Sequence, residues 1–440
     1  MRLRGVRLPL NVLLIGGGGR EAALAWAFSR SPRLGRLDCA PGNAGIERHA
    51  RRVPIPADDL ERLLAHATRE RYDLVVVGPE APLVGGLADR LRDAGIAVFG
   101  PSAAAARVEG SKADAKRFME RHRIPTAGFR IFDRLDDARA YLSARGTTYP
   151  LVVKADGLAA GKGVVLADAA AAAIEAAEGM LSGRSFGDAG RSIVVEERLT
   201  GRETSLFALT DGTAFVELAP CQDYKRAFDR DAGPNTGGMG TYSPSAWIDR
   251  PTRAAITETI LAPTIAGLAA EGRPFRGVLF VGVMLTAAGP KVLEYNARFG
   301  DPETQVLIPR LDGDWLDLLD ACARGRLDEV APRFLDVASV CVVMASGGYP
   351  GSYERGRLIE GLDEAERLEG VTVFHAGTER DASGAIVTSG GRVLGITATA
   401  ADLADARDRA YRAVGRIRWA GEHHRTDIAL DAITAARERR

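Results

Sequence analysis

Polar side chains recur at alternate positions in one short segment, 290–304. Its first half has the pattern of a β-strand that begins after the turn residues Ala288, Gly289 and Pro290. Because side chains alternate across a strand, Glu294, Asn296 and Arg298 are expected on one face, and Val292 is expected to share it. A carboxylate and an amide oxygen two residues apart suit a hard cation such as Mg²⁺, and a guanidinium can fork onto a carboxylate or a phosphate. A solvent-exposed strand face explains the same pattern, so this segment alone leaves both interpretations open.

The segment continues into Asp301–Pro302, which has a simpler interpretation. An Asp before a first-turn Pro is typical of a helix start, and N-capping alone accounts for it. A helix is therefore expected after Glu303, followed by another over 315–323.

Lysine is rare in this chain. Of 58 basic residues only six are Lys, at 112, 116, 154, 162, 225 and 291. Where Arg serves the general surface, a retained Lys more often supplies a compact, mobile ammonium group. Four of the six (112, 154, 162 and 225) lie in the motifs described below.

The N-terminal part has the pattern of a doubly wound parallel sheet. A strand over 10–15, four glycines and a helix over 21–29 form an anion-binding arrangement. Gly17-x-Gly19-x-x-Ala22 partly matches the dinucleotide fingerprint, with Asp38 near the position of a ribose-binding acid. Such a match indicates the fold more reliably than it indicates NAD.

Further loops follow the strands of this part. A strand over 73–77, a helix to Ala94 and a strand over 96–99 are expected. Together with 41–45, the loops 78–80 and 100–102 fall at carboxyl ends of strands, where parallel sheets bind ligands. Their number favours a site over ordinary turns.

The segment 154–163 invites a P-loop interpretation, which fails. The glycine spacing is one residue short, Gly163 follows Lys162 where Ser or Thr is required, and a strand over 164–166 comes next instead of a helix. What remains is a glycine-rich loop between two strands, able to fold over a polyphosphate. Lys154 ends the apolar strand before it, which an ordinary hairpin does not require.

Other segments complete the central region. A helix from Ser111, as N-cap, to His122 is expected, and a strand over 193–199 whose end can hydrogen-bond an adenine edge. The polar, glycine-dense segments 221–226 and 233–244 are too long for simple turns, and long ordered loops are usually functional.

The composition excludes several classes of protein. With 440 residues, 46% hydrophobic and 26% charged, the chain suits a multi-domain globular protein. Its zero net charge favours neither nucleic acid nor an anionic membrane, and no apolar run is long enough to span a bilayer. The basic, then apolar N-terminus is interpreted as a tail and first strand, not a secretion signal. Four scattered cysteines fit a reducing cytoplasm.

From about Asp336 the pattern changes to short strands (339–344, 371–375 and 392–397) and one helix (403–416). His423–His424 lacks metal-ligand partners at useful spacing, so a surface turn is expected there.

Assembled in this order, the motifs closely resemble those of the phosphoribosylamine–glycine ligases (glycinamide ribonucleotide synthetases), ATP-grasp enzymes of purine synthesis. The resemblance runs from about Val12 to Asp427. The motifs that carry it are GGGGRE (16–21), PGNAG (41–45), VGPEAPL (77–83), GSKA (110–113), KADGLAAGKGV (154–164), EERLTGRE (196–203), GPNTGGMGTYSP (233–244), RFGDPET (298–304) and SGGYPG (346–351). Ala22 departs from the family, which usually has His there.

The resemblance implies a set of site residues. Those implied for ATP are Lys112, Lys154, Gly161, Lys162, Gly163, Glu196, Glu197, Leu199 and Glu203. Those implied for metal are Glu294 and Asn296, and those implied for catalysis are Arg298, Lys225 and Asp223. Those implied for 5-phosphoribosylamine and glycine are Gly18, Gly19, Arg20, Glu21, Asn43, Pro79, Glu80, Asn235, Thr236, Gly237, Asp301, Pro302 and Glu303.

The resemblance also implies the architecture and the reaction. It implies an α/β protein with an N-terminal doubly wound parallel-sheet domain (1–110), a two-lobed α+β ATP-grasp domain (111–335, with a lid over about 126–198) and a small mixed α/β C-terminal domain (336–440). The implied reaction joins glycine to 5-phosphoribosylamine through glycyl phosphate, with ATP as co-substrate and Mg²⁺ or Mn²⁺ as cofactor. A cytoplasmic monomer is expected, with transient contacts to neighbouring purine-pathway enzymes, and no nucleic-acid or membrane partner.

Three alternatives stay open. The first is another ATP-grasp ligase or carboxylase, against which the loops 41–45, 78–80 and 233–244 speak. The second is an NAD-dependent oxidoreductase, which leaves 154–304 unexplained. The third is a non-catalytic nucleotide-binding relative, which the retained lysines, Glu294 and Asn296 disfavour.

Overall fold

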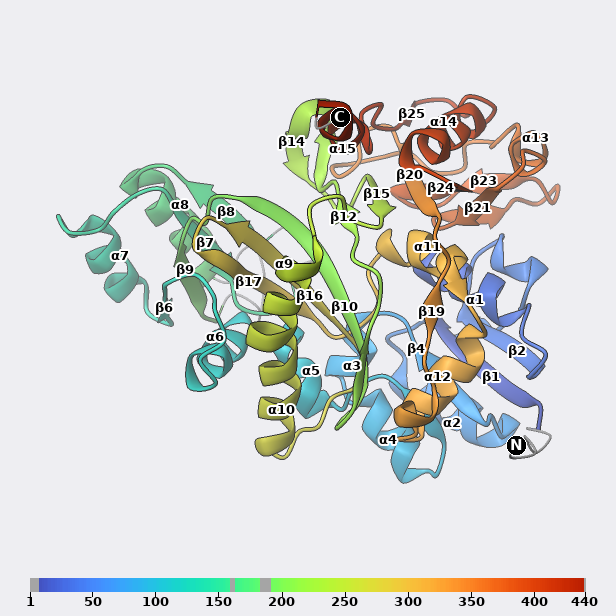
Figure 1. Cartoon of the computed structure of the whole chain (residues 1–440), viewed down its shortest axis with the longest axis horizontal. Helices are drawn as coiled ribbons and strands as arrows, with labels where there is room; N and C mark the ends of the chain where they lie inside the picture. Colours follow the sequence, from blue (N-terminus) through green and yellow to red (C-terminus); the bar gives the residue numbers. More distant parts are fainter. Residues whose placement is uncertain (1–7, 159–162, 183–190, 439–440) are drawn as a thin grey trace.

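The computed structural model of the chain describes residues 8–158, 163–182 and 191–438 (Figure 1). An N-terminal sheet lies below a C-terminal sheet in this view, and two further sheets extend to the left. In the described part of the chain, no helix is both long and apolar enough to cross a bilayer.

The N-terminal sheet is parallel throughout, in the order β3-β2-β1-β4-β5, as predicted for a doubly wound domain. Leu13 and Ile15 of its first strand pack in one core cluster with α2 and α4, whereas Val12 and Leu14 pack in another with α1 and α12. The second face is therefore covered partly by a helix from much later in the chain. The elements are β1 (Leu10–Gly16), α1 (Gly19–Phe28), β2 (Leu34–Pro41), β3 (Arg51–Arg52), α2 (Leu60–Glu70), β4 (Leu74–Val77), α3 (Glu80–Val84), α4 (Leu87–Asp93), β5 (Ala97–Phe99) and α5 (Ala103–Gly110); α12 is Trp315–Ala323.

Two predictions for this part were wrong in detail. The single helix expected up to Ala94 is two helices, because Gly86 adopts φ +83° between α3 and α4. Asp38 is fully buried and accepts hydrogen bonds from both Arg51 Nε (2.9 Å) and Arg51 Nη2 (2.7 Å), as well as from Tyr72. Its carboxylate is fully buried and paired with these side chains, so it lacks the accessibility that a ribose-binding acid needs.

The lid sheet is antiparallel, in the order β6-β9-β7-β8, and has its own small core cluster with α7 and α8. Lys154 pairs with Val164 across β7 and β8, so the predicted glycine-rich loop does connect two strands. The elements are β6 (Phe129–Phe132), α7 (Leu135–Ser143), β7 (Leu151–Ala155), β8 (Val164–Ala167), α8 (Ala170–Leu181) and β9 (Ile193–Glu197).

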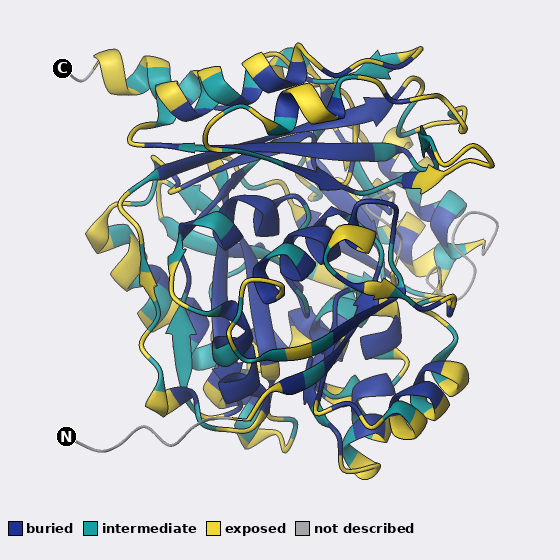
Figure 2. Cartoon of the chain, turned by 90° about the vertical axis from the view of Figure 1, so that its right-hand side faces the viewer, coloured by how far each residue is buried: buried dark blue, intermediate teal, exposed yellow. Residues whose placement is uncertain are grey.

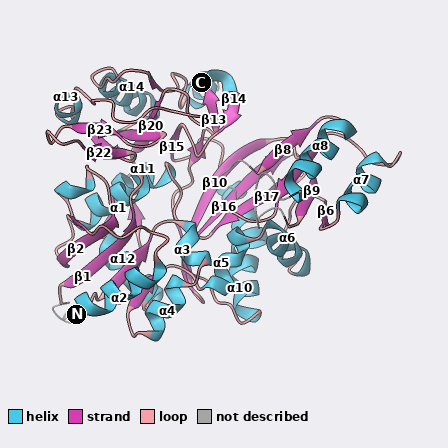
Figure 3. Ribbon diagram, turned by 180° about the vertical axis from the view of Figure 1, so that it is seen from behind, coloured by secondary structure: helices cyan, strands magenta, loops and turns pink. Residues whose placement is uncertain are grey.

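The large central sheet is antiparallel, in the order β11-β10-β16-β17. The helix α6 follows α5 and precedes the lid strand β6 in the chain. Its N-cap is Ser111, whose Oγ accepts from Asp114 N at 3.0 Å, as predicted. Figure 3 shows the long strands β10, β16 and β17 side by side. The elements are α6 (Lys112–Arg121), β10 (Arg202–Asp211), β11 (Phe215–Glu217), α9 (Arg250–Ile256), a π-helical turn (Thr257–Leu261), α10 (Ala262–Ala270), β16 (Arg276–Thr286), β17 (Gly289–Asn296) and α11 (Glu303–Leu307).

The C-terminal sheet follows the order β12-β15-β20-β24-β21, with β25 also pairing with β20. Its first two strands come from 222–243, so the central region of the sequence contributes directly to it. The sheet is buried beneath partly exposed helices (Figure 2). The elements of this sheet and its helices are β12 (Gln222–Asp223), β15 (Gly240–Ser243), β20 (Ala338–Ser346), α13 (Leu362–Glu366), β21 (Val371–His375), β24 (Arg392–Ala400), α14 (Leu403–Val414), β25 (Glu422–His423) and α15 (Leu430–Glu438). Separate two-stranded sheets are formed by β13 (Arg226–Phe228) with β14 (Ala232–Asn235), β18 (Leu311–Asp312) with β19 (Arg333–Phe334), and β22 (Thr378–Arg380) with β23 (Ile386–Thr388).

The surface turn predicted at His423–His424 was also wrong. His423 belongs to β25, and its Nε2 lies 2.8 Å from the main-chain oxygen of Ala227. The short strand is half-buried because it continues the ladder of β20.

Candidate active site

The strand β17 carries the predicted metal-binding pair, but with a bulge. Gly282 pairs with Glu294 and Val283 with Val292, so Leu293 is an extra residue. One extra residue exchanges the two faces of a strand. Val292 is accordingly fully buried in the hydrophobic core, and the prediction that it shares a face with Glu294 was wrong.

Glu294 lies among ammonium groups. Its Oε1 is 3.5 Å from Lys225 Nζ, and the side chain is 39% exposed. Burial alone would raise the pKa of this carboxyl, but Lys225, Lys154 and Lys112 outweigh it and lower the pKa to about 2. Glu294 is thus an ionised carboxylate at neutral pH.

The donor set fits a divalent cation. Asn296 is buried, at 9% exposed, two residues after Glu294 on the same strand. An ionised carboxylate and an amide oxygen are suitable ligands for Mg²⁺, which takes few protein groups and keeps water or phosphate oxygens. No cluster of three or more His, Cys, Asp or Glu suited to a metal occurs among the described residues.

Two lysines, one on α6 and one on the lid strand β7, lie near Glu294. Lys112 Nζ, on α6, donates to Gly157 O at 3.0 Å, and Lys154 Nζ, on β7, donates to Leu293 O at 3.2 Å. Burial is the main cause that lowers the pKa of Lys112. Both lie near enough to Glu294 to act on its charge. Gly163 O accepts from Ala155 N at 2.8 Å, while Gly161 and Lys162 lie outside the described residues.

The acids at the end of β9 lie on opposite faces. Glu196 is buried, with Oε1 at 3.1 Å from Lys154 Nζ. Glu197 is half exposed and accepts from Gly128 N at 3.0 Å and from Lys291 Nζ at 3.2 Å. Leu199 follows in a half-buried position. Of the nearby acids, Glu203 joins the Glu294 cluster, because it forms a short ion pair with Lys225.

Asp223 adds an unsatisfied acid close to this cluster. Its Oδ1 is buried and has no hydrogen-bond partner among the described residues. Burial, and then the charge of Glu303, raise the pKa of Asp223 well above its usual value. Glu303 Oε1 itself accepts from Ser205 Oγ at 3.3 Å. For Lys225, burial alone would lower the pKa, but Glu203 and Glu294 raise it well above its usual value.

The guanidinium of Arg298 pairs with two carboxylates; the sequence left a carboxylate and a phosphate open as its partner. Its Nε is 3.1 Å from Glu80 Oε2, and its Nη2 is 3.0 Å from Glu109 Oε1. Glu80 opens α3 directly after Pro79, so the loop at the end of β4 is fixed to the end of β17. Glu109 was not identified from the sequence, because nothing in the pattern of α5 distinguishes it from a surface acid.

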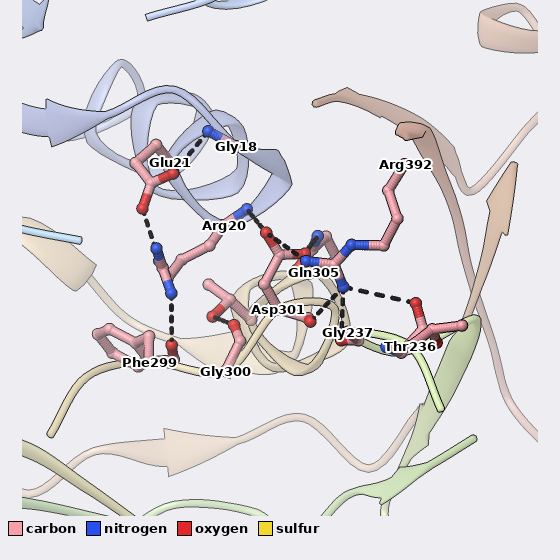
Figure 4. A network of polar contacts seen from close by, with 12 residues as sticks. Gly18, Arg20, Glu21, Thr236, Gly237, Phe299, Gly300, Asp301, Gln305 and Arg392 are labelled. Atoms are coloured by element: carbon pink, nitrogen blue, oxygen red, sulfur yellow. Dashed lines mark hydrogen bonds and ion pairs between the residues drawn. The ribbon is translucent and has the colours of Figure 1, made fainter. Parts of the chain in front are cut away.

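A second network joins the first glycine loop to Asp301 (Figure 4). The Glu21 carboxylate accepts from Gly18 N at 2.7 Å and from Arg20 Nε at 2.5 Å. Arg20 Nη1 donates to Phe299 O at 3.0 Å, and Arg20 N to Asp301 Oδ2 at 3.3 Å. A Cβ on Gly19 would lie 2.4 Å from Gln305 Nε2, so a larger residue there would displace the side chain that donates to Asp301.

Asp301 is not an N-cap, so that prediction was wrong. The helix α11 begins at Glu303 after Pro302 without a side-chain cap. The carboxylate of Asp301 instead accepts from Gln305 Nε2 at 2.8 Å. Burial alone would raise its pKa, but Arg392 and Arg20 lower it, so the group is ionised.

A cavity of about 300 Å³ lies beside this network, between the N-terminal and C-terminal sheets. The first side is lined by Gly17, Gly18, Gly42 and Asn43, and Asp301 lies between the two sides. The second side is lined by Tyr349, Ala376, Gly377, Thr378, Glu379, Ser389 and Arg392. The C-terminal lining was not predicted, although the glycine-rich segments 346–351 and 389–392 were its signal.

Other predicted residues are engaged in different ways. Asn43 Nδ2 donates to both Gly17 O and His375 O at 2.9 Å, so this side chain holds the loop. Thr236 Oγ1 donates to Lys225 O at 2.8 Å, and Gly237 O accepts from Arg392 Nη1 at 2.6 Å. Asn235 is exposed on the β13–β14 hairpin.

The fold and the site together define the class of this protein: it is an ATP-grasp protein, with a two-sheet lobe pair and lysines around a carboxylate–amide pair. Three family models divide it: phosphoribosylglycinamide synthetase N domain over residues 10–109, ATP-grasp (A) domain over 110–304, and C domain over 339–431. The chain belongs to the phosphoribosylglycinamide synthetase family, as its motifs predicted.

Relatives and solved structures agree with this assignment. Phosphoribosylamine–glycine ligase of Rhodopirellula baltica is 48% identical over 97% of this chain and 98% of the relative, and that of Brucella melitensis is 50% identical over 96% and 98%. The crystal structure of phosphoribosylamine–glycine ligase from Thermotoga maritima is 34% identical, with a TM-score of 0.84, covering 96% of this chain and 100% of that one. Biotin carboxylase from Campylobacter jejuni, 15% identical over 94% and 93% with a TM-score of 0.72, shares the fold.

Proposed function

We infer that this chain joins glycine to 5-phosphoribosylamine at the expense of ATP, giving glycinamide ribonucleotide, ADP and phosphate in de novo purine biosynthesis. The observation that supports this most directly is that Lys112, Lys154 and Lys225 surround the ionised Glu294. The family models also match nearly the whole chain. It is a carbon–nitrogen ligase of the ATP-grasp class, with ATP as co-substrate and Mg²⁺ or Mn²⁺ as cofactor.

The reaction has two steps. A carboxylate oxygen of glycine attacks the γ-phosphorus of ATP, and ADP leaves, which gives glycyl phosphate. The amine nitrogen of phosphoribosylamine then attacks the acyl carbon; phosphate leaves and the nitrogen loses a proton. The first step brings anions together, so fixed positive charge supplies most of the catalysis.

We propose that Lys112 and Lys154, with the glycine loop 161–163, hold the phosphates. Glu294 and Asn296 would hold the cation, which neutralises phosphate charge when bound. Glu196, Glu197, Leu199 and Glu203 complete the nucleotide set. Holding both reactants in the reactive orientation can lower the activation free energy by up to about 7–11 kcal/mol.

We propose that the 300 Å³ cavity takes the phosphoribosylamine. The donors of the glycine loop before α1 suit its phosphate, and the ionised Asp301 suits its ribose hydroxyls. Arg20, Glu21, Asn43, Thr236 and Gly237 hold the cavity walls. Asp223, Lys225, Arg298 and Glu303 lie toward the reacting groups, with Pro79, Glu80 and Pro302 supporting them.

The three domains are proposed to divide near residues 110 and 335, with the lid over about 126–198. We further propose a cytoplasmic monomer. One feature supports the cytoplasmic compartment: the four cysteines are buried and unpaired.

The test is ADP release from purified protein with each substrate omitted in turn, phosphoribosylamine being formed in situ from ribose 5-phosphate and ammonia. Release should require ATP, glycine and the amine together. Turnover with bicarbonate or another amino acid in place of glycine would favour another ATP-grasp ligase. Binding of ATP without turnover would favour a non-catalytic relative.

A further inference from the structure

Lys116 is a buried charged residue to which the proposed reaction assigns no role. It is 2% exposed and lies one turn after Lys112 on α6. Its Nζ donates to Thr126 Oγ1 at 2.6 Å and lies 3.1 Å from Glu196 Oε2. A buried cation is costly unless it is paired, so these contacts are necessary for the fold to hold it.

The partner of Lys116 is shared with a nucleotide-site lysine. Glu196 places Oε2 on Lys116 and Oε1 on Lys154, each at 3.1 Å. Two ammonium groups on one carboxylate leave a net charge of one positive unit. With only one ammonium, Glu196 and Lys154 would form a neutral pair.

The same ammonium group lies where three elements meet. Thr126, which accepts from Lys116, donates its own hydroxyl to Val292 O at 2.7 Å. Val292 is on β17, two residues before Glu294, and Glu196 is on β9 of the lid. Lys116 therefore connects α6, the lid sheet and the strand of the proposed metal ligands.

We propose that Lys116 is a positioning residue for the nucleotide site: it neutralises Glu196 and so leaves the positive charge of Lys154 for a phosphate of ATP. This rests on the proposed use of ATP. The same contact fixes β9 relative to β17 and so keeps Lys154 beside Glu294.

The test is Lys116→Met, measured by steady-state kinetics and by calorimetric binding of ATP without turnover. We expect KM and Kd for ATP to rise about 10-fold or more, since a charge-assisted contact of Lys154 with phosphate is weakened. KM for glycine and for phosphoribosylamine should stay within about twofold. Adding Glu196→Gln to Lys116→Met should recover part of the ATP affinity, because the unneutralised carboxylate is gone; a merely structural role would give no recovery.

The matched control is Arg273→Met. Arg273 Nη1 lies 2.7 Å from Oδ2 of Asp114, which is on α6. Asp114 is two residues before Lys116 and therefore lies on another face of that helix. This variant should lower the melting temperature without changing the KM for ATP. If Lys116→Met does not fold, Thr126→Val is used instead. It removes one partner of the ammonium and should weaken ATP binding about twofold.

The proposal would be overturned if folded Lys116→Met bound ATP as tightly as the wild type. It would also be overturned if Lys116→Met raised the KM of all three substrates equally. Its failure is separable from that of the proposed function. If the wild-type protein binds ATP but does not join glycine to the amine, the function is wrong while the calorimetric comparison still tests Lys116.

Discussion

The Nη1 atom of Arg392 donates to the main-chain oxygen of Asp301 at 2.5 Å. The same atom lies 2.6 Å from Gly237 O, and Nη2 lies 3.6 Å from the Asp301 carboxylate. One guanidinium thus joins β24, the segment before α11 and the loop before β15. Among the described residues that line the cavity it is the one cation, so the C-terminal sheet is part of the proposed site.

Arg392→Met should weaken phosphoribosylamine binding selectively. The change removes hydrogen bonds from a charged donor, each contributing about 1.5–3 kcal/mol, so KM for the amine should rise about 10–100-fold. KM for ATP should change little, because none of the nucleotide-set residues contacts Arg392 in the described structure. Substrate-saturation kinetics measure both.

A matched control exists at the same domain junction. Arg380 Nε lies 2.8 Å from Glu47 Oε2, but both side chains are exposed, at 43% and 33%. An exposed pair contributes about 0–1 kcal/mol, so Arg380→Met should leave both KM values near those of the wild type. Equal effects of the two substitutions would show that Arg392 only holds the domains together.

Glu294→Gln should reduce turnover by about 10²–10³-fold, the usual scale for loss of one electrostatic contact at a transition state. The variant keeps the shape of the side chain but lacks the negative charge that faces the three lysines. ADP release measured against Mg²⁺ concentration should also show a higher requirement for the ion. Near-normal turnover would remove Glu294 from the metal role, and Glu364→Gln on an exposed helix position is the control.

The sequence predicted the order of elements well, because the strands and helices follow local rules. The apolar strands, the Ser111 cap and the glycine loops at strand ends are properties of short segments. The failures at Val292 and Asp301 have longer-range causes. A bulge opposite Gly282 places Val292 in the core. The Asp301 carboxylate accepts a hydrogen bond from Arg20 N, 281 residues away, instead of capping a helix.

Assembly explains what the sequence did not predict. The C-terminal lining, Tyr349 and Arg392 above all, is separated from the first glycine loop by more than 300 residues and meets it only when the sheets pack. Likewise α12 covers the N-terminal sheet, and the strands at 222–243 extend the C-terminal one. Periodicity within a segment carries no information about such partners.

Asn43→Asp should disturb the junction between the first and last domains. Asn43 Nδ2 donates to the carbonyl oxygens of Gly17 and His375, both at 2.9 Å. A carboxylate cannot donate there and would face two oxygens, so a stability loss of about 2–4 kcal/mol is expected, with a higher KM for the amine. Asn235→Asp, at an exposed position, adds the same charge without burying it and should lose much less stability in urea unfolding; an equal loss would contradict this reasoning.

His375 should make stability depend on pH. Its ring is 2% exposed and packs against Gly45, where a Cβ would lie 2.3 Å from the ring Cγ. Its Nδ1 is 3.1 Å from Thr378 Oγ1, and its Nε2 has no hydrogen-bond partner in the part of the chain that the structure describes. Burial, then the charges of Arg48 and Arg380, lower the pKa of His375 to about 4 from its ordinary value of 6.5. Between these two values the unfolded chain binds a proton that the folded chain does not. The contribution of His375 is therefore complete above about pH 6.5 and is lost as the pH falls toward 4.

The expected loss between pH 7 and pH 5 is about 2 kcal/mol, from roughly 1.4 kcal/mol per pKa unit. Urea unfolding of the wild type and of His375→Gln at pH 7.0, 6.0 and 5.0 measures it. Other groups titrate equally in both proteins, so the difference between the two curves isolates His375. The wild type should lose more stability than the variant on acidification, and parallel curves would mean that the buried ring takes up its proton without unfolding.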